Sequence, residues 1–396
     1  MYQETYSDLL RQLSENELVS LTQKLIQFKS INPPGNELEI AEYIGGLLAE
    51  EGMEVEVLAH SGSRASVMAK VVGGEEPALI YSGHLDVVQA EGNWRHDPFS
   101  GHIADGKIWG RGATDMKSGV AAMIAAASAI ARARLKLKGP LFLSFTAGEE
   151  TDNLGAVETL NNYHFGPVRA IFVSEPSDNE IYTAEKGALW LEIWTYGRAA
   201  HISRMEDGRN ALMMMLPILE ALDKMEVPYE THPLLGDYQR SINAIRAGEN
   251  TNTIPADCVA KVDQRTVPGQ NHEALVSRIR DLINEVSQAS NLVDFKAELR
   301  IITDNPPLEV DAKEPVLAKL FKIAAEINGK AQEEPKGVGY FTDAVKFSPA
   351  LGAPFAICGP GNPSLNHKAD ESVEIGRLID SARIYTMAAA EYLGAG

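Results

Sequence analysis

Hydrophobic residues recur at helical intervals near the start of the chain. Leu18, Leu21 and Leu25 lie three or four residues apart, and Ser14 and Glu17 before them have the spacing of a capping box. This pattern predicts an amphipathic helix with one face against the core. An Asn-Pro-Pro-Gly-Asn stretch at residues 32–36 interrupts the pattern, which resumes at residues 38–48 as a second helix.

Short apolar runs between turn residues predict strands in the first half of the chain. An alanine-rich helix is expected at residues 118–133, between the third and fourth strands. Such alternation is typical of an α/β fold with a mainly parallel sheet and helices on both faces. The predicted strands are residues 54–58, 66–71, 78–82, 141–146 and 170–174.

The pattern changes at about residue 187, where strands and helices follow the order β-α-β-β-α-β. This order is typical of a ferredoxin-like α+β domain. Its predicted elements are residues 189–195, 210–225, 241–247, 258–266, 272–286 and 293–302.

The last part of the chain returns to α/β character. Residues 315–328 and 375–393 predict helices and residues 354–358 predict a buried strand, and these need a sheet to join. We therefore expect residues 1–186 and 304–396 to form one discontinuous domain, interrupted by a smaller domain at residues 187–303.

Charge and cysteine content exclude several classes of protein. The 396 residues carry a formal charge of −19, which disfavours nucleic acid and anionic membrane surfaces as partners. Two cysteines, Cys258 and Cys358, cannot make a disulfide framework and fit a reducing cytosol. Residues 1–20 lack the pattern of a signal peptide, and residues 118–133 are too short to span a bilayer. We expect a cytoplasmic protein.

Side chains that can bind metal follow predicted strands at four places, and a fifth candidate lies in the glycine-rich turn before the alanine-rich helix. Ligand sites in open α/β sheets gather beyond the carboxyl ends of the strands, so these side chains should meet. His84 and Asp86 should also point to the same side of an extended segment. The candidates are His84, Asp86, Asp115, Glu149, Glu150, Glu175 and His367.

The chemistry of this set favours two divalent metal ions. Two histidines and three carboxylates without cysteine suit a pair of ions that share one bridging carboxylate, with zinc favoured and cobalt or manganese as alternatives. Such a pair can activate water for hydrolysis. Glu149 beside the ligand Glu150 suits a proton carrier, provided that Gly148 lets the chain turn, because neighbouring side chains of a regular strand face opposite ways.

Each candidate also has a structural explanation when it is taken alone. Glu-Glu pairs are usually solvated, the glycine-rich turn could simply start a helix, and His367 beside Lys368 could be a surface residue. Their shared position at strand ends favours the functional interpretation.

These motifs resemble those of the dinuclear metallo-amidohydrolases and exopeptidases. That family includes acetylornithine deacetylase, succinyl-diaminopimelate desuccinylase, aminoacylase and glutamate carboxypeptidase. The resemblance covers nearly the whole chain. It rests on Ser-Gly-His-Leu-Asp at His84, Gly-Arg-Gly-Ala-Thr-Asp-Met-Lys-Ser-Gly at Asp115, the pair Glu149 and Glu150, Ser-Glu-Pro at Glu175, and Asn-His at His367.

The resemblance implies a role for each candidate. One metal would bind His84, Asp115 and Glu175, and the other would bind Asp115, Glu150 and His367, with Asp115 bridging. Glu149 would be the general base, and Asp86 would accept the second ring N–H of His84. The family also implies a cis peptide bond after Asp115.

The inserted domain resembles the lid and dimerisation domain of the family. His201 would then reach the site of a neighbouring subunit and stabilise an oxyanion, and Asn252, Arg265 and Thr342 would contact the substrate. Without the family, His201 reads as a strand-end histidine, Asn252 as a turn residue and Arg265 as a solvated charge. Arg265 is chemically suited to grip a substrate carboxylate.

The expected activity is hydrolysis of the amide bond of an N-acyl amino acid or a related amine by a homodimer. The segment before Thr342 carries Tyr340 and Phe341 where the family commonly has glycine or serine, which favours a bulkier or more apolar group. A dipeptidase or carboxypeptidase of the same family is the nearest alternative. A metal-bearing binding protein without catalysis is the alternative from another class.

Overall fold

A computed structural model describes residues 2–394, which fold into two compact units. The first unit ends at Thr183 and resumes over Val310–Lys336 and from Thr342 onward. The second, the inserted unit, comprises Ala184–Glu309 and Gly337–Phe341. The sequence placed the inserted domain at residues 187–303 and did not anticipate that residues 337–341 would join it.

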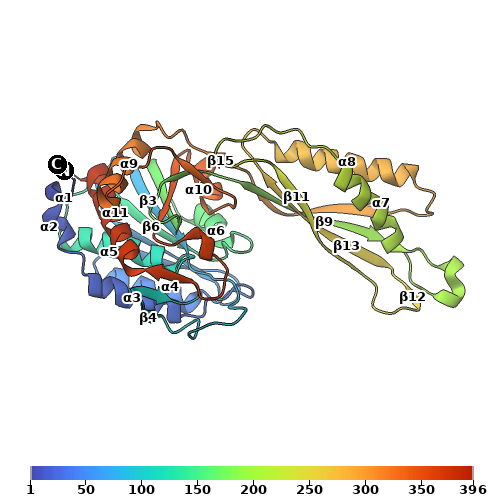
Figure 1. Ribbon diagram of the computed structural model, residues 1–396, viewed down its shortest axis with the longest axis horizontal. Coiled ribbons are helices and arrows are strands. Elements are labelled where there is room, and N and C mark those ends of the chain that lie inside the picture. The colour runs from blue at the N-terminus through green and yellow to red at the C-terminus, as the bar shows by residue number, and fades with distance from the viewer. Residues whose placement is uncertain (1, 395–396) are drawn as a thin grey trace. The chain divides into compact units, whose positions relative to one another are not determined.

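A large sheet forms the centre of the first unit (Figure 1). Its central strands β6, β3, β7 and β17 run parallel, and β1 and β2 continue the sheet antiparallel beyond β6. The expected mainly parallel sheet is therefore confirmed. In sheet order the strands are β1 (Glu54–Ala59), β2 (Ala65–Val71), β6 (Leu141–Thr146), β3 (Ala78–His84), β7 (Val168–Pro176), β17 (Phe355–Gly359) and β8 (Tyr182–Glu185).

Helices cover both faces of this sheet because its central strands are apolar on both sides. Every residue of β3 and β6 is buried, as a parallel sheet between helical layers requires. Leu143 and Tyr81 join one large core, whereas the neighbouring Phe142 packs on Phe165, which in turn contacts Phe347. The main helices are α3 (Glu15–Gln27), α4 (Leu38–Glu50), α5 (Lys117–Arg132), α6 (Leu154–Asn162), α9 (Pro315–Asn328), α10 (Ala344–Leu351) and α11 (Ile375–Leu393).

Several short elements complete the first unit. Ser14 caps α3 by accepting the N–H of Glu17, as the capping-box spacing predicted. A small antiparallel sheet joins β18, β5 and β4. The short elements are α1 (Tyr2–Thr5), α2 (Ser7–Leu10), β4 (His102–Ala104), β5 (Lys107–Trp109), η2 (Pro363–Leu365) and β18 (Ser372–Glu374), with β16 (Lys336–Val338) at the boundary.

The inserted unit has the predicted ferredoxin-like topology. Its sheet has the antiparallel order β11-β13-β9-β14, and α7 and α8 pack on one face over Leu191, Ile193 and Val262. Its elements are β9 (Gly187–Tyr196), β10 (Ala200–His201), η1 (Ile202–Asp207), α7 (Ala211–Lys224), β11 (Gln239–Ala247), β12 (Thr253–Ile254), β13 (Asp257–Thr266), α8 (His272–Ala289), β14 (Ala297–Asn305) and β15 (Leu308–Glu309).

One predicted strand is displaced along the chain. The apolar pair Leu292 and Val293 suggested a strand over residues 293–302, but β14 begins at Ala297. Asp294 has a φ of 58°, which is typical of a turn, and Leu292 and Val293 are exposed. The prediction was therefore wrong at its start, because two exposed apolar residues of a turn have the same sequence pattern as the start of a strand.

Among the described residues, no helix combines the length and apolar character that crossing a bilayer requires.

Candidate metal centre

The candidate ligands converge at the carboxyl ends of the parallel strands. His84 is the last residue of β3 and pairs in register with Thr146, the last residue of β6, which the chain follows to Glu150. Glu175 lies near the end of β7, and His367 lies in the loop after β17. The tertiary structure therefore brings together residues that are separated by more than 200 positions, such as Glu150 and His367.

Two groups of side chains share Asp115 and have the composition of metal sites. The first is His84, Asp115 and Glu175, and the second is Asp115, Glu150 and His367, with the ligand atoms of each group within 4.8 Å of one another. The Oδ1 atom of Asp115 lies 3.0 Å from Nε2 of His84, and its Oδ2 atom lies 3.5 Å from Nε2 of His367. Each oxygen of Asp115 thus faces a different histidine, as a bridging carboxylate requires.

The ionisable side chains of the first group lie close together and are all buried. Burial alone would lower the pKa of His84, but the charge of Glu175 and the contact with Asp115 raise that pKa well above its ordinary value. Burial and the charge of Asp115 raise the pKa of Glu175 to about 7. A divalent cation would supply the positive charge that these carboxylates otherwise take from protons.

The second group is open to solvent on one side. The side chain of His367 is 51% exposed, while that of Glu150 is 7% exposed. Hydrogen bonds with Asp115 and Glu150 raise the pKa of His367 to about 10. This histidine has a φ of 61°, so the loop holds it in the left-handed region to aim its ring at the carboxylates.

Asp86 has a different contact from the one predicted. Nδ1 of His84 makes its 2.9 Å hydrogen bond with the backbone carbonyl of Asp86, while the carboxylate lies 3.6 Å from this nitrogen. The carboxylate instead accepts the backbone N–H groups of Gly148, Glu149 and Glu150 at 3.0 to 3.2 Å. Asp86 therefore orients His84 through its backbone and holds the residues that carry the proposed base through its side chain.

Gly148 lets the two neighbouring glutamates serve one site. Its φ is 81°, and its carbonyl accepts N–H groups from Thr151, Asp152 and Asn153, which makes a compact turn. We call residues 147–153 the Glu149 turn. The condition that Gly148 bend the chain is met because this φ is freely open only to glycine.

The carboxylate of Glu149 is buried within electrostatic reach of the candidate metal ligands. It is 7% exposed and has no hydrogen-bond partner among residues 2–394. Burial is the largest cause that raises its pKa well above the ordinary value, with Glu175 and Glu150 adding to the shift against the charge of His84. A carboxylate in this environment suits proton transfer.

The loop that carries Asp115 is held by a buried ion pair that sequence reasoning missed. Glu371 accepts the N–H groups of Thr114 and Asp115 at 2.7 and 3.0 Å, and Arg111 donates to its other oxygen. The peptide bond between Asp115 and Met116 is cis, as the family resemblance implied. Glu371 could have been suspected because it follows His367 by only four residues.

In the inserted unit, the structure brings His201 and Asn252 together. His201 pairs with Thr253 in the β10–β12 ribbon, and the carbonyl of Asn252 accepts the N–H of Ile202 at 3.0 Å. The side chains of His201 and Asn252 are exposed. Nδ1 of His201 accepts the N–H of Ser203, so the proton of a neutral imidazole lies on Nε2, which can donate outward.

Arg265 lies near the end of β13, in the four-stranded sheet of the inserted unit, and not in the β10–β12 ribbon. Its Nε donates to Asp263 at 3.1 Å, and its guanidinium lies 5.7 Å from the ring centre of Trp190. Trp190 also makes an edge contact with Phe341 at 5.9 Å between ring centres. Asp263 engages only Nε, and the terminal nitrogens of Arg265 have no hydrogen-bond partner in the described part of the chain.

Thr342 is fully buried, and its Oγ1 accepts the N–H of Ala344 at the start of α10. The adjacent Asp343 accepts hydrogen bonds from Thr146, which directly precedes the Glu149 turn, and from Asn153, the last residue of that turn. The Thr-Asp-Ala element thus braces the Glu149 turn.

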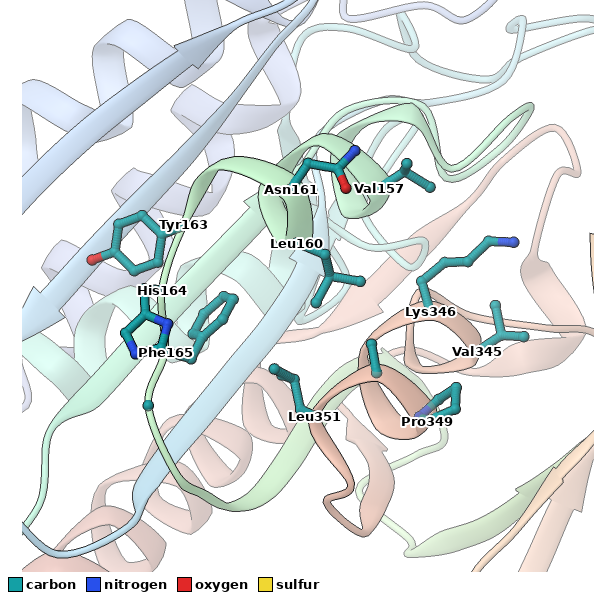
Figure 2. A pocket seen from close by; sticks show the side chains of 12 residues that line it. Val157, Leu160, Asn161, Tyr163, His164, Phe165, Val345, Lys346, Pro349 and Leu351 are labelled. Atoms are coloured by element: carbon teal, nitrogen blue, oxygen red, sulfur yellow. The ribbon is translucent and has the colours of Figure 1, made fainter.

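A separate cleft of about 600 Å³ lies between α6 and α10 (Figure 2). Val157 and Leu160 line it from α6, and Val345 and Pro349 line it from α10. None of the candidate metal ligands lines this cleft.

Comparison with known proteins places the chain in a family. Residues 80–391 match the model of peptidase family M20/M25/M40. The chain belongs to this family. The M20 assignment confirms the resemblance inferred from the motifs, and the protein is a metallohydrolase that acts on amides.

The individual relatives have low sequence identity to this chain. A protein from Staphylococcus epidermidis named as a probable succinyl-diaminopimelate desuccinylase is 26% identical, and the alignment covers 96% of this chain and 99% of the relative. The N-formyl-4-amino-5-aminomethyl-2-methylpyrimidine deformylase of Bacillus subtilis is 27% identical, with 97% and 96% covered. An M20 family metallo-carboxypeptidase from Sulfolobus solfataricus has a similar fold, with a TM-score of 0.78 over 94% of this chain and 98% of that chain at 18% identity.

Proposed function

We propose that this protein is a dinuclear zinc deacylase that hydrolyses the amide bond of an N-acyl amino acid or a related amine. The observation that carries the proposal is Glu149, a buried carboxylate without a hydrogen-bond partner among residues 2–394, in the field of two ligand groups that share Asp115. Cobalt and manganese are alternatives to zinc.

The donor set fits two divalent ions. Imidazole nitrogens and carboxylate oxygens suit zinc, and the two oxygens of Asp115 face the two histidines. When bound, the ions would act as Lewis acids toward the water and the amide carbonyl. His84 and Glu175 would hold one ion, Glu150 and His367 the other, and Asp115 both.

Proton transfer is assigned to Glu149. Its carboxylate would take a proton from the attacking water and later deliver it to the nitrogen of the departing amine. Burial raises the pKa of Glu149, which favours the acid form that delivers this proton. Asp86 would hold the backbone of Glu149 throughout.

His201 would stabilise the oxyanion of the tetrahedral intermediate. Ser203 occupies Nδ1 of His201, which leaves Nε2–H as the outward donor. Asn252 lies beside it on the same ribbon and could contribute a second polar contact.

Arg265 would bind a carboxylate of the substrate. Its terminal nitrogens can form a bidentate pair, while Asp263 and Trp190 hold the guanidinium. The Trp190–Phe341 contact beside it favours an apolar group next to the carboxylate.

The distance between these residues supports a homodimer. Arg265 and Asp257 are at opposite ends of β13, about 27 Å apart at the usual rise of a strand, and the ribbon with His201 joins near Asp257. That span is much longer than an N-acyl amino acid. His201 and Asn252 of one copy would therefore contact a different substrate molecule from Arg265 of that copy, as in a homodimer that shares its sites. The low cysteine count supports a cytoplasmic location.

The main alternative is an exopeptidase, because the same groups would cleave a dipeptide or a C-terminal residue. A panel of N-formyl, N-acetyl and N-succinyl amino acids, tested against dipeptides with zinc-loaded enzyme, separates the two. We expect the highest kcat/KM for an acylated amino acid with a free carboxylate. Turnover of dipeptides alone would replace the deacylase proposal with the exopeptidase.

A binding protein without catalysis would retain metal but hydrolyse no member of the panel. Elemental analysis of the purified protein therefore accompanies the panel. We expect about two equivalents of divalent metal per chain, as in other two-metal hydrolases.

A further inference from the structure

Arg64 lies beside the Glu149 turn although it is distant in sequence. It is the last residue before β2, and its carbonyl accepts the N–H of His60, which closes the bend after β1. Its side chain is 11% exposed. The bend therefore places the long cationic side chain of Arg64 largely out of solvent, next to the Glu149 turn.

The guanidinium of Arg64 grips the turn by two parallel hydrogen bonds. Nη1 and Nη2 each donate to one oxygen of Asp152 at 2.8 Å. A Cβ built on Gly148 would overlap Nη2 of Arg64. The planar group is thus pressed against the backbone of Gly148 while it holds the side chain of Asp152.

A second loop supports Arg64 from behind. A Cβ on Gly35 would lie 2.8 Å from Cδ of Arg64, so this glycine leaves room for the arginine stem. Glu37 follows in the same loop, fully buried, with Oε1 at 4.0 Å from Nε of Arg64. Neither carboxylate oxygen of Glu37 has a hydrogen-bond partner in the described chain, so Arg64 is its nearest compensating charge.

The Glu149 turn needs such support because the proposed base has none of its own. The carboxylate of Glu149 has no hydrogen-bond partner among residues 2–394, so its position depends on the backbone of the turn. Asp86 holds the first half of that turn through three N–H groups. Arg64 is the counterpart that holds the second half, through Asp152.

We propose that Arg64 is a positioning residue for hydrolysis. Its guanidinium clamps the Glu149 turn by binding the side chain of Asp152 and packing against the backbone of Gly148, which keeps the carboxylate of Glu149 directed at the reacting water. The inference rests on the proposed role of Glu149 as general base. The clamp needs the planar fork of arginine, because a lysine ammonium cannot make two parallel bonds to one carboxylate.

The test compares Arg64→Ala, Arg64→Lys and Asp152→Asn with the wild-type enzyme, all loaded with zinc. A displaced base slows chemistry more than binding, so we expect kcat to fall about 10–100-fold in each variant while KM changes less than about threefold. Metal content should remain that of the wild type. Hydrogen exchange followed by mass spectrometry should show faster exchange of the amides of residues 148–153.

A double-mutant cycle separates positioning from general stability. If Arg64 acts through Glu149, adding Arg64→Ala to Glu149→Ala should not lower the residual rate further. Additive losses would overturn the proposal, as would a wild-type kcat in Arg64→Ala or a loss of metal that accounts for the lower rate. If Arg64→Ala does not fold, Asp152→Asn removes the other end of the clamp with little change in volume and decides the question.

Arg169→Ala is the matched control. Arg169 also pairs with a carboxylate in the first unit, at 2.9 Å from Glu76, but its side chain is 33% exposed, and among the described residues no hydrogen bond or ion pair joins either side chain to the Glu149 turn. We expect unchanged kcat and exchange. A wild-type enzyme that hydrolyses no amide would defeat the proposed function alone, because the exchange measurement tests the clamp without turnover.

Discussion

The two units present their candidate residues in opposite ways. In the first unit, His84, Asp115 and Glu175 are 1%, 7% and 3% exposed and contact one another. In the inserted unit, His201 and Asn252 are exposed and have free polar atoms that face solvent. The buried set is complete within one unit, whereas the polar atoms of the exposed set are open to contact with another molecule. Variants in the two units should therefore fail in different ways.

The largest effect is expected from Glu149→Ala in the first unit. Loss of a general base typically costs about 10²–10⁴-fold in rate. Metal content should be unchanged, because Glu149 belongs to neither ligand group. Steady-state kinetics and elemental analysis on one preparation check both points, and undiminished turnover would place the base elsewhere.

His201→Ala in the inserted unit should lower kcat by about 10²–10³-fold, the usual cost of one oxyanion donor. Because His201 is exposed, its loss should leave metal content and the melting temperature unchanged. Mixing this variant with Glu149→Ala should restore activity if the two units of different copies share a site. The absence of recovery after verified subunit exchange would show that His201 does not act across an interface.

Asp86→Ala should weaken metal binding only slightly, because the backbone carbonyl that accepts the hydrogen bond from Nδ1 of His84 remains in the variant. His84→Ala removes a ligand and should weaken it more. Asp86→Ala should also lower the melting temperature, because three backbone N–H groups lose their acceptor. Chelator competition and thermal melts measure the two effects. Equal metal loss in both variants would mean that Asp86 itself binds the ion.

Arg265→Lys should raise KM about tenfold and change kcat little, since it weakens a contact present in both ground and transition states. Arg278→Lys is the control, because Arg278 forms an exposed ion pair with Glu285 in the same unit. A fall in kcat at constant KM would show that Arg265 acts on the chemistry and does not merely hold the substrate.

The smallest effect is a pH dependence confined to the first unit. Burial raises the pKa of Glu175 and of Glu371 from 4.5 to about 7. A carboxyl whose pKa is higher in the folded state contributes stability below pH 4.5 that is lost as the pH rises through about 7. The melting temperature of metal-free protein should therefore fall by several degrees between pH 5 and pH 8, and less so in Glu175→Gln. A pH-independent melting temperature would show that these carboxyl groups are already ionised.

Much of the fold was predictable because local patterns and tertiary packing agree. The strand at residues 141–146 and the helices at 315–328 and 375–393 have the expected bounds, since their apolar residues face one core. The displaced β14 shows the limit: Leu292 and Val293 are apolar but lie exposed in a turn. The spacing of apolar residues predicts a helix or strand correctly only when the tertiary structure buries those residues.

The sequence by itself determined which chemistry is available, because residue types at strand ends and in distinctive motifs are readable without coordinates. His84, Asp115, Glu150, Glu175 and His367 were named in this way, and the structure gathers them into two groups that share Asp115. Only the tertiary structure decided how the site is supported. The carboxylate of Asp86 accepts hydrogen bonds from the Glu149 turn, and Arg64 binds the same turn through Asp152, which is 88 positions away in the sequence. Such contacts depend on the direction and distance of side chains across neighbouring strands, which linear spacing does not encode.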